Sequence, residues 1–180
     1  MKEIYKKMKT LYNLNYITRY NRLPVITRET VSSHLFHTTM ISLLLYEKYK
    51  NKIKLDLNKI LITSLIHDCG ETIVGDILYV TKLKLSKNAR KEIETIEKNA
   101  NNEMLDYKYK ELCEEFENES TPEAIIVRLS DCLSCNIYSE AEISCGNKNM
   151  KEVLNESNRR IKEETKKIEK FIKCQKVKKY

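Results

Sequence analysis

The sequence LNKILITSLIHDCG, residues 57–70, carries the strongest structural signal in this chain. Residues 57–66 are apolar over most of a helical circumference, which predicts a central, buried helix. His67 and Asp68 follow at the end of that helix, and Gly70 is typical of a helix terminus. A carboxylate beside a core needs a partner, because burying an unpaired charge costs several kcal/mol. The stretch therefore predicts a helical core with a polar site attached to it.

The composition around this stretch favours an all-α fold. The 180 residues include 3 glycines and 2 prolines, which is too few for the many turns of a β-rich protein. Asp56, Ser86 and Thr121 are suited to cap helices at their N-termini. Helical spacing predicts further helices over residues 2–19, 30–49, 86–106, 108–116, 121–145 and 150–174, whereas residues 69–84 are expected to be irregular. We therefore expect one compact domain, residues 1–180, built as a helical bundle.

Charge and targeting signals bear on the location and the partners of the protein. The formal net charge is +7, and much of the excess lies in the C-terminal basic helix and tail, residues 150–180. Such charge suits a nucleotide, a nucleic acid or a membrane surface, although a solvated helix face is the interpretation we favour. No signal peptide or membrane-spanning segment is recognisable, so we expect a cytoplasmic protein that does not bind membranes. The cysteines are then reduced, and Cys132 and Cys135 are expected to be buried thiols.

A small set of side chains is suited to binding a metal ion. Asp131 interrupts the apolar stretch IIVRLSDCL, residues 125–133, and so places a carboxylate on a core-facing helix. Two imidazoles and two carboxylates would suit Mn, Fe, Co, Ni or Zn and would disfavour Ca. An isolated HD dipeptide arises often by chance, so a core histidine beside a capping acid remains the alternative. The chain has three histidines, all in strongly apolar segments: His34, His37 and His67.

Three segments resemble the HD superfamily of phosphohydrolases, and within it the small 5′-deoxynucleotidases of bacteria and archaea. They are RETVSSH at residues 28–34, LIHDCGETIVGDI at 65–77, and TPEA at 121–124 followed by RLSD at 128–131. They occur in the order of the family, and the resemblance covers about residues 19–142. It implies an all-helical bundle of the HD-domain type, in which one divalent metal ion is held by His34, His67, Asp68 and Asp131.

The resemblance also implies roles for residues around the metal ion. Glu71 matches the acid/base carboxylate of the family. Asp76 matches an acid near the sugar and the leaving group, although an N-cap role is an alternative. Arg22 matches an arginine that faces the phosphate, and Arg19 and Arg28 compete with it for that role.

Three positions qualify the resemblance. Leu23 stands where many relatives carry a tryptophan that helps to exclude a ribose 2′-hydroxyl, so it is the residue expected beside the sugar. Ser33 replaces the usual glutamate before the first histidine. His37 lies one helical turn after His34, but the family has no metal ligand there, so we expect it to pack in the core or to contact the ligands.

The resemblance implies hydrolysis of a small nucleotide by metal-activated water. The expected function is removal of the 5′-phosphate from (deoxy)ribonucleoside monophosphates, in a homodimeric protein. A dNTP triphosphohydrolase is the alternative, and Lys82 and Lys84 would suit its longer phosphate chain. A nucleic-acid-binding protein with a vestigial site is a third possibility, which the complete ligand set and the lack of a recognisable binding motif disfavour.

Overall fold

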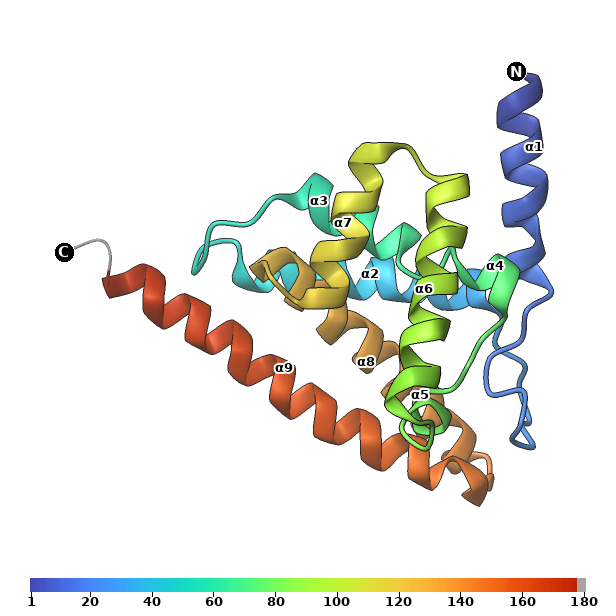
Figure 1. Cartoon of the computed structure of the whole chain (residues 1–180). Helices are drawn as coiled ribbons and strands as arrows, with labels where there is room; N and C mark the ends of the chain where they lie inside the picture. Colours follow the sequence, from blue (N-terminus) through green and yellow to red (C-terminus); the bar gives the residue numbers. More distant parts are fainter. Residues whose placement is uncertain (178–180) are drawn as a thin grey trace.

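The computed structural model describes residues 1–177, and residues 178–180 of the predicted tail lie outside it. It describes the backbone alone at Val80, Asn102, Met104, Tyr107, Lys108 and residues 175–177. Throughout residues 1–177 the regular structure is helical, with one isolated bridge between Thr18 and Thr30 in place of a sheet. This confirms the predicted all-α fold (Figure 1). The elements are α1 (Lys2–Leu11), the 3₁₀ turn η1 (Tyr12–Asn15), α2 (Val31–Tyr49), α3 (Leu57–Ile66), α4 (Glu71–Val74), α5 (Tyr79–Lys82), α6 (Lys87–Met104), α7 (Tyr107–Asn118), α8 (Pro122–Ser144), η2 (Lys148–Met150) and α9 (Lys151–Val177).

Helix α8 is the centre of the bundle. It packs against α2, α3, α7 and α9, and its apolar residues form most of the main core together with Leu45, Ile60 and Ile168. The long helix α9 runs along α8 on one side of the molecule, whereas α1 projects away from the bundle (Figure 1). None of the described helices has an apolar stretch long enough to cross a lipid bilayer.

Local capping signals set the start of several helices where the sequence predicts it. Thr30 accepts a hydrogen bond from the Ser33 amide, and the Ser33 hydroxyl accepts one from the Thr30 amide, which forms a reciprocal cap at α2. Asp56, Ser86 and Thr121 each accept a backbone hydrogen bond at the starts of α3, α6 and α8. These interactions span three residues, so the sequence by itself predicts them.

Two segments differ from the prediction. The first helix does not continue to residue 19 but ends at Leu11, because the following chain bonds to a distant segment. The Val31 amide donates to the Ile17 carbonyl and the Arg19 amide donates to the Glu29 carbonyl, at 3.0 and 2.9 Å. Residues 69–84, expected to be irregular, contain the short helices α4 and α5.

Glu142 connects the loop before α2 to the end of α8 through hydrogen bonds. Its buried carboxylate accepts hydrogen bonds from the amides of Ile26 and Thr27, at 2.8 and 2.7 Å, and from the Asn147 side chain at 2.7 Å. Burial acts to raise the pKa of Glu142, but these hydrogen bonds outweigh it and hold the pKa below its ordinary value.

We expect Glu142→Gln to lower the free energy of unfolding by about 2 kcal/mol at pH 7, because an amide replaces a charged acceptor of several hydrogen bonds. The depressed pKa in the folded state contributes stability above the unfolded pKa of about 4.3, and this contribution is lost as pH falls through the folded pKa. Urea denaturation at pH 7 and near pH 3.5 measures both effects. Glu140→Gln, at an exposed neighbour, is the control, and a difference that stays constant with pH would contradict the assignment.

Candidate active site

The four predicted metal ligands come together from three parts of the fold. His34 lies on α2, His67 and Asp68 directly follow α3, and Asp131 lies in the middle of α8. The Nε2 atom of His34 is 3.2 Å from an Asp131 oxygen and 3.6 Å from an Asp68 oxygen. His67 Nε2 is 3.5 Å from the same Asp68 oxygen. The donor atoms of His34, His67 and Asp68 all lie within 4.8 Å of one another.

Hydrogen bonds orient both imidazoles so that one nitrogen faces this cluster. His67 Nδ1 lies 2.9 Å from the Ser64 carbonyl, to which it must donate, so Nε2 carries the lone pair. His34 Nδ1 lies 3.1 Å from the Ser134 hydroxyl, which leaves Nε2 toward the two carboxylates. Such bonds fix ring orientation in metal sites.

The cluster fits a divalent cation. His67 Nε2 is buried without a hydrogen-bond partner among the described residues, and its lone pair faces a carboxylate. Burial and the charge of Arg19 lower the pKa of His34 to about 4, so its imidazole is neutral, as a metal ligand must be. Burial acts to raise the pKa of Asp131, but its hydrogen bond with His34 outweighs burial and holds the pKa well below its ordinary value, so the group is a carboxylate. A cation would satisfy the lone pair and both negative charges.

A cavity of about 150 Å³ opens beside the cluster, and Glu71 and Asp76 line it. The side chain of Glu71 is buried, and its Oε2 atom has no hydrogen-bond partner among the described residues. Burial, followed by the charges of Asp68 and Asp76, raises the pKa of Glu71 well above its ordinary value. Asp76 accepts a hydrogen bond from the Tyr20 amide at 3.1 Å. Since Leu78 is the residue at the start of α5, the N-cap alternative for Asp76 is not observed.

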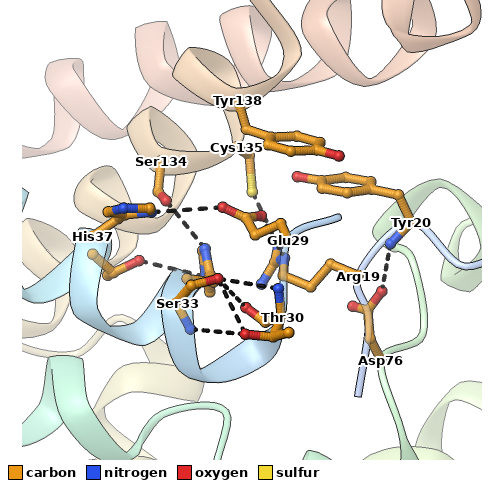
Figure 2. A network of polar contacts seen from close by, with 12 residues as sticks. Arg19, Tyr20, Glu29, Thr30, Ser33, His37, Asp76, Ser134, Cys135 and Tyr138 are labelled. Atoms are coloured by element: carbon orange, nitrogen blue, oxygen red, sulfur yellow. Dashed lines mark hydrogen bonds and ion pairs between the residues drawn. The ribbon is translucent and has the colours of Figure 1, made fainter. Parts of the chain in front are cut away.

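The structure places Arg19 at this cavity and leaves Arg22 outside its lining. Arg19 is buried, with its guanidinium 3.3 Å from carboxylate oxygens of both Asp68 and Glu29. It also donates to the Cys135 sulfur at 3.2 Å (Figure 2). The side chain of Arg22 is 40% exposed and lies 3.9 Å from Glu152. The bonds that join residues 17–19 to 29–31 turn Arg19, a competing candidate in the sequence, inward, and they leave Arg22 at the surface.

Tyr20 occupies the cavity wall where Leu23 was expected. Its side chain is 2% exposed and stacks on Tyr138, with ring centroids 4.9 Å apart (Figure 2). Leu23 packs behind it in a small apolar cluster and does not line the cavity. The pair Arg19-Tyr20, an arginine followed by a bulky aromatic residue, was the signal that could have indicated both residues.

Other predicted residues take different places. His37 is exposed over 56% of its side chain and lies 3.8 Å from Glu29. The prediction that it packs in the core is therefore wrong, and it is not in the ligand cluster. Arg28 is exposed. Cys132 and Cys135 are both free thiols, and Cys132 is buried as expected, whereas Cys135 is half-buried. Three further basic residues line the cavity: Lys82, Arg128 and Arg160. The sequence linked Lys82 only to the alternative function, and it did not indicate Arg128 or Arg160 as substrate contacts.

A second cavity of about 350 Å³ adjoins the first. The two share Asp68, Glu71, Tyr79, Lys82 and Arg128 in their walls. Its outer wall comes from α6 and α7 and is rich in carboxylates and amides. The site therefore combines a cationic part beside the cluster with an adjoining polar space.

Comparisons with known proteins agree with this geometry. The model of a family described as YfbR-like 5′-deoxynucleotidases matches residues 6–178. The curated 5′-deoxynucleotidase HDDC2 of Dictyostelium discoideum is 32% identical over 132 residues, which cover 68% of this chain. The match spans 65% of the length of that relative.

Solved structures share the fold. A conserved hypothetical protein from Pyrococcus furiosus is 30% identical, with a TM-score of 0.73 over 89% of this chain and 98% of its own. A Pyrococcus horikoshii protein is 25% identical, with a TM-score of 0.78 over 94% and 96%. An HD-domain phosphohydrolase from Listeria innocua, 20% identical with a TM-score of 0.75 over 94% and 86%, confirms the predicted HD-domain type of bundle. By the match of the family model along nearly its whole length, the chain belongs to the YfbR-like 5′-deoxynucleotidase family.

Proposed function

We propose that this protein is a metal-dependent 5′-nucleotidase that removes phosphate from (deoxy)ribonucleoside monophosphates. The observation that carries the proposal is the unpartnered His67 Nε2 atom, which faces a carboxylate at the wall of a cavity. Family membership and the names of relatives in the family support the same activity.

His34, His67, Asp68 and Asp131 are the residues that would hold the metal ion. The mixed nitrogen and oxygen donors suit Mn, Co, Fe, Ni or Zn. A cation bound there would supply a Lewis acid for the phosphoryl group and would lower the pKa of the attacking water.

The surrounding side chains bind, orient and move protons. Glu71 is buried, has a raised pKa and projects into the cavity, so it can orient the water and protonate the leaving oxygen. Asp76 lines the same cavity, where it would contact the sugar. Arg19 takes the place proposed for Arg22, because its guanidinium lies at the ligand cluster and can stabilise charge on phosphoryl oxygens. Tyr20, at the position expected for Leu23, limits the space around the sugar.

The structure favours a monophosphate over the triphosphate alternative. Lys84 is 69% exposed, lies 4.0 Å from Glu152 and is not among the residues that line the cavity. Lys82 lines the cavity but is paired with Glu97 at 2.7 Å. The cationic part of the site is also small, at about 150 Å³.

The homodimer remains part of the proposal, and a surface feature supports it. Phe36 and Met40 on α2 and Ile137 on α8 are 61%, 44% and 56% exposed, and they border an apolar groove of about 390 Å³. Contiguous exposed apolar surface is typical of interfaces. A cytoplasmic location stays a prediction.

The test is a substrate panel with metal-stripped protein to which Mn, Co, Ni, Zn or Mg is returned. We expect phosphate release from 5′-monophosphates with one or more of the transition metals, and at least about a hundredfold less without metal. A 3′-monophosphate serves as the matched control substrate. Release of triphosphate from dNTPs would support the alternative. If no nucleotide is hydrolysed although metal is verified in the protein, the proposal is contradicted.

A further inference from the structure

Arg160 brings the C-terminal helix α9 to the catalytic cavity. It lies in the first half of α9, is half-buried, and lines the cavity beside Asp131. Its guanidinium is held over the ring of Tyr79, a residue of α5, with 4.6 Å between the guanidinium carbon and the ring centroid. The planar group is therefore fixed by a ring on one face while its edge remains available for hydrogen bonds.

The other basic side chains of the cavity are already neutralised. Each has at least one carboxylate close enough for an ion pair, so each can bind an anion only after exchanging a partner. The pairs are Arg19 with Asp68 and Glu29 at 3.3 Å each, Lys82 with Glu97 at 2.7 Å, and Arg128 with Glu119 at 3.7 Å and with Asp131 at 3.8 Å.

Arg160 differs from these residues. Within the part of the chain that the structure describes, it forms no hydrogen bond and no ion pair, and the Tyr79 ring is its specific contact. Asp131 and Glu156 also line the cavity and interact electrostatically with Arg160, although neither forms an ion pair with it. However, Asp131 is within 3.2 Å of His34, and Glu156 binds the guanidinium of the neighbouring Arg159. Arg160 therefore lines the cavity without a carboxylate at ion-pair distance in the described part of the chain, so a phosphate group could pair with it without displacing one.

We propose that Arg160 binds the phosphoryl group of the substrate and that α9 thereby completes the active site. This inference rests on the proposed nucleotidase function. A guanidinium forms two parallel hydrogen bonds with phosphate oxygens and remains charged at any relevant pH.

Lys162 offers a matched control on the same helix. It is exposed and does not line the cavity. We expect Arg160→Ala to lower kcat/KM for a 5′-monophosphate about a hundredfold. Arg160→Lys should lower it about tenfold, because lysine keeps the positive charge but cannot form two parallel hydrogen bonds with the phosphate. Lys162→Ala should remain within about twofold of the wild-type protein.

Binding measurements separate the inference from the proposed function. Calorimetric titration with a deoxynucleoside monophosphate, inorganic phosphate and the free nucleoside should show about a hundredfold weaker binding of both phosphate ligands to Arg160→Ala. Nucleoside binding should be unchanged, and thermal melting checks that Arg160→Ala and Arg160→Lys are folded.

Each result has a definite meaning. If the wild-type protein hydrolyses no nucleotide but Arg160→Ala still loses phosphate binding, the inference stands and the proposed function fails. If hydrolysis is observed and Arg160→Ala binds phosphate normally, the inference is wrong and the function stands. An equal loss of nucleoside binding would also overturn it, because Arg160 would then support the base or the cavity wall. Absence of phosphate binding to the wild-type protein would overturn the inference, and absence of nucleotide hydrolysis as well would overturn both.

Discussion

Asp68→Asn is expected to reduce hydrolysis of 5′-monophosphates at least about a thousandfold and to weaken metal binding more than about a hundredfold. Loss of a residue that merely supports a ligand already costs 10- to 100-fold in other metal sites, and Asp68 is proposed as a ligand itself. An amide is a poor ligand for these cations because it carries no charge. The change also removes one of the two carboxylates that lie 3.3 Å from Arg19, so that Glu29 alone then pairs with its guanidinium.

Metal content after dialysis, determined by mass spectrometry, and phosphate release test this prediction on the same preparation. Asp106→Asn is the control, because the Asp106 side chain is 73% exposed and makes no capping hydrogen bond at α7. The control should keep both properties. If Asp68→Asn retained metal and activity, the ligand assignment would be wrong.

Glu71→Gln is expected to lower kcat about a thousandfold while metal content and KM change little. General acid–base groups contribute roughly 10²- to 10⁴-fold to rate, and glutamine preserves the shape of the side chain but cannot transfer a proton. The backbone of α4 should be unaffected, because the Glu71 amide, which bonds to the Asp68 carbonyl at 3.1 Å, remains.

Phosphate release under saturating substrate, together with metal analysis, measures the effect. Glu92→Gln, at an exposed position of α6 outside both cavities, is the control. The two predictions separate two roles, since Asp68→Asn should lose the metal and Glu71→Gln should keep it. Loss of metal from Glu71→Gln would instead place Glu71 among the ligands.

Much of the fold follows from local sequence. The starts of α3, α6 and α8 agree with the prediction because Asp56, Ser86 and Thr121 bond to amides three residues away. The four predicted metal ligands also lie together, because apolar helices that carry isolated polar residues must bury those residues against one another.

The arginines show where local sequence was insufficient. Arg19 and Arg22 are three residues apart in the same loop, and either could face the phosphate. The choice depends on the backbone bonds between residues 17–19 and 29–31, which turn Arg19 toward Asp68 and leave Arg22 at the surface. Such pairing is made between segments separated along the chain, so the composition of the loop does not reveal it.

The sequence by itself determined an all-helical protein, because helical periodicity and capping act within a few residues, and its resemblance to the HD superfamily predicted His34, His67, Asp68 and Asp131 as metal ligands. Only the tertiary structure decided which other side chains surround that set. Arg160 reaches the cavity because α9 packs along α8, and Tyr20 reaches it by stacking on Tyr138. Contacts between residues so far apart depend on how whole helices pack, and the burial of apolar surface on α8 and α9 fixes that packing.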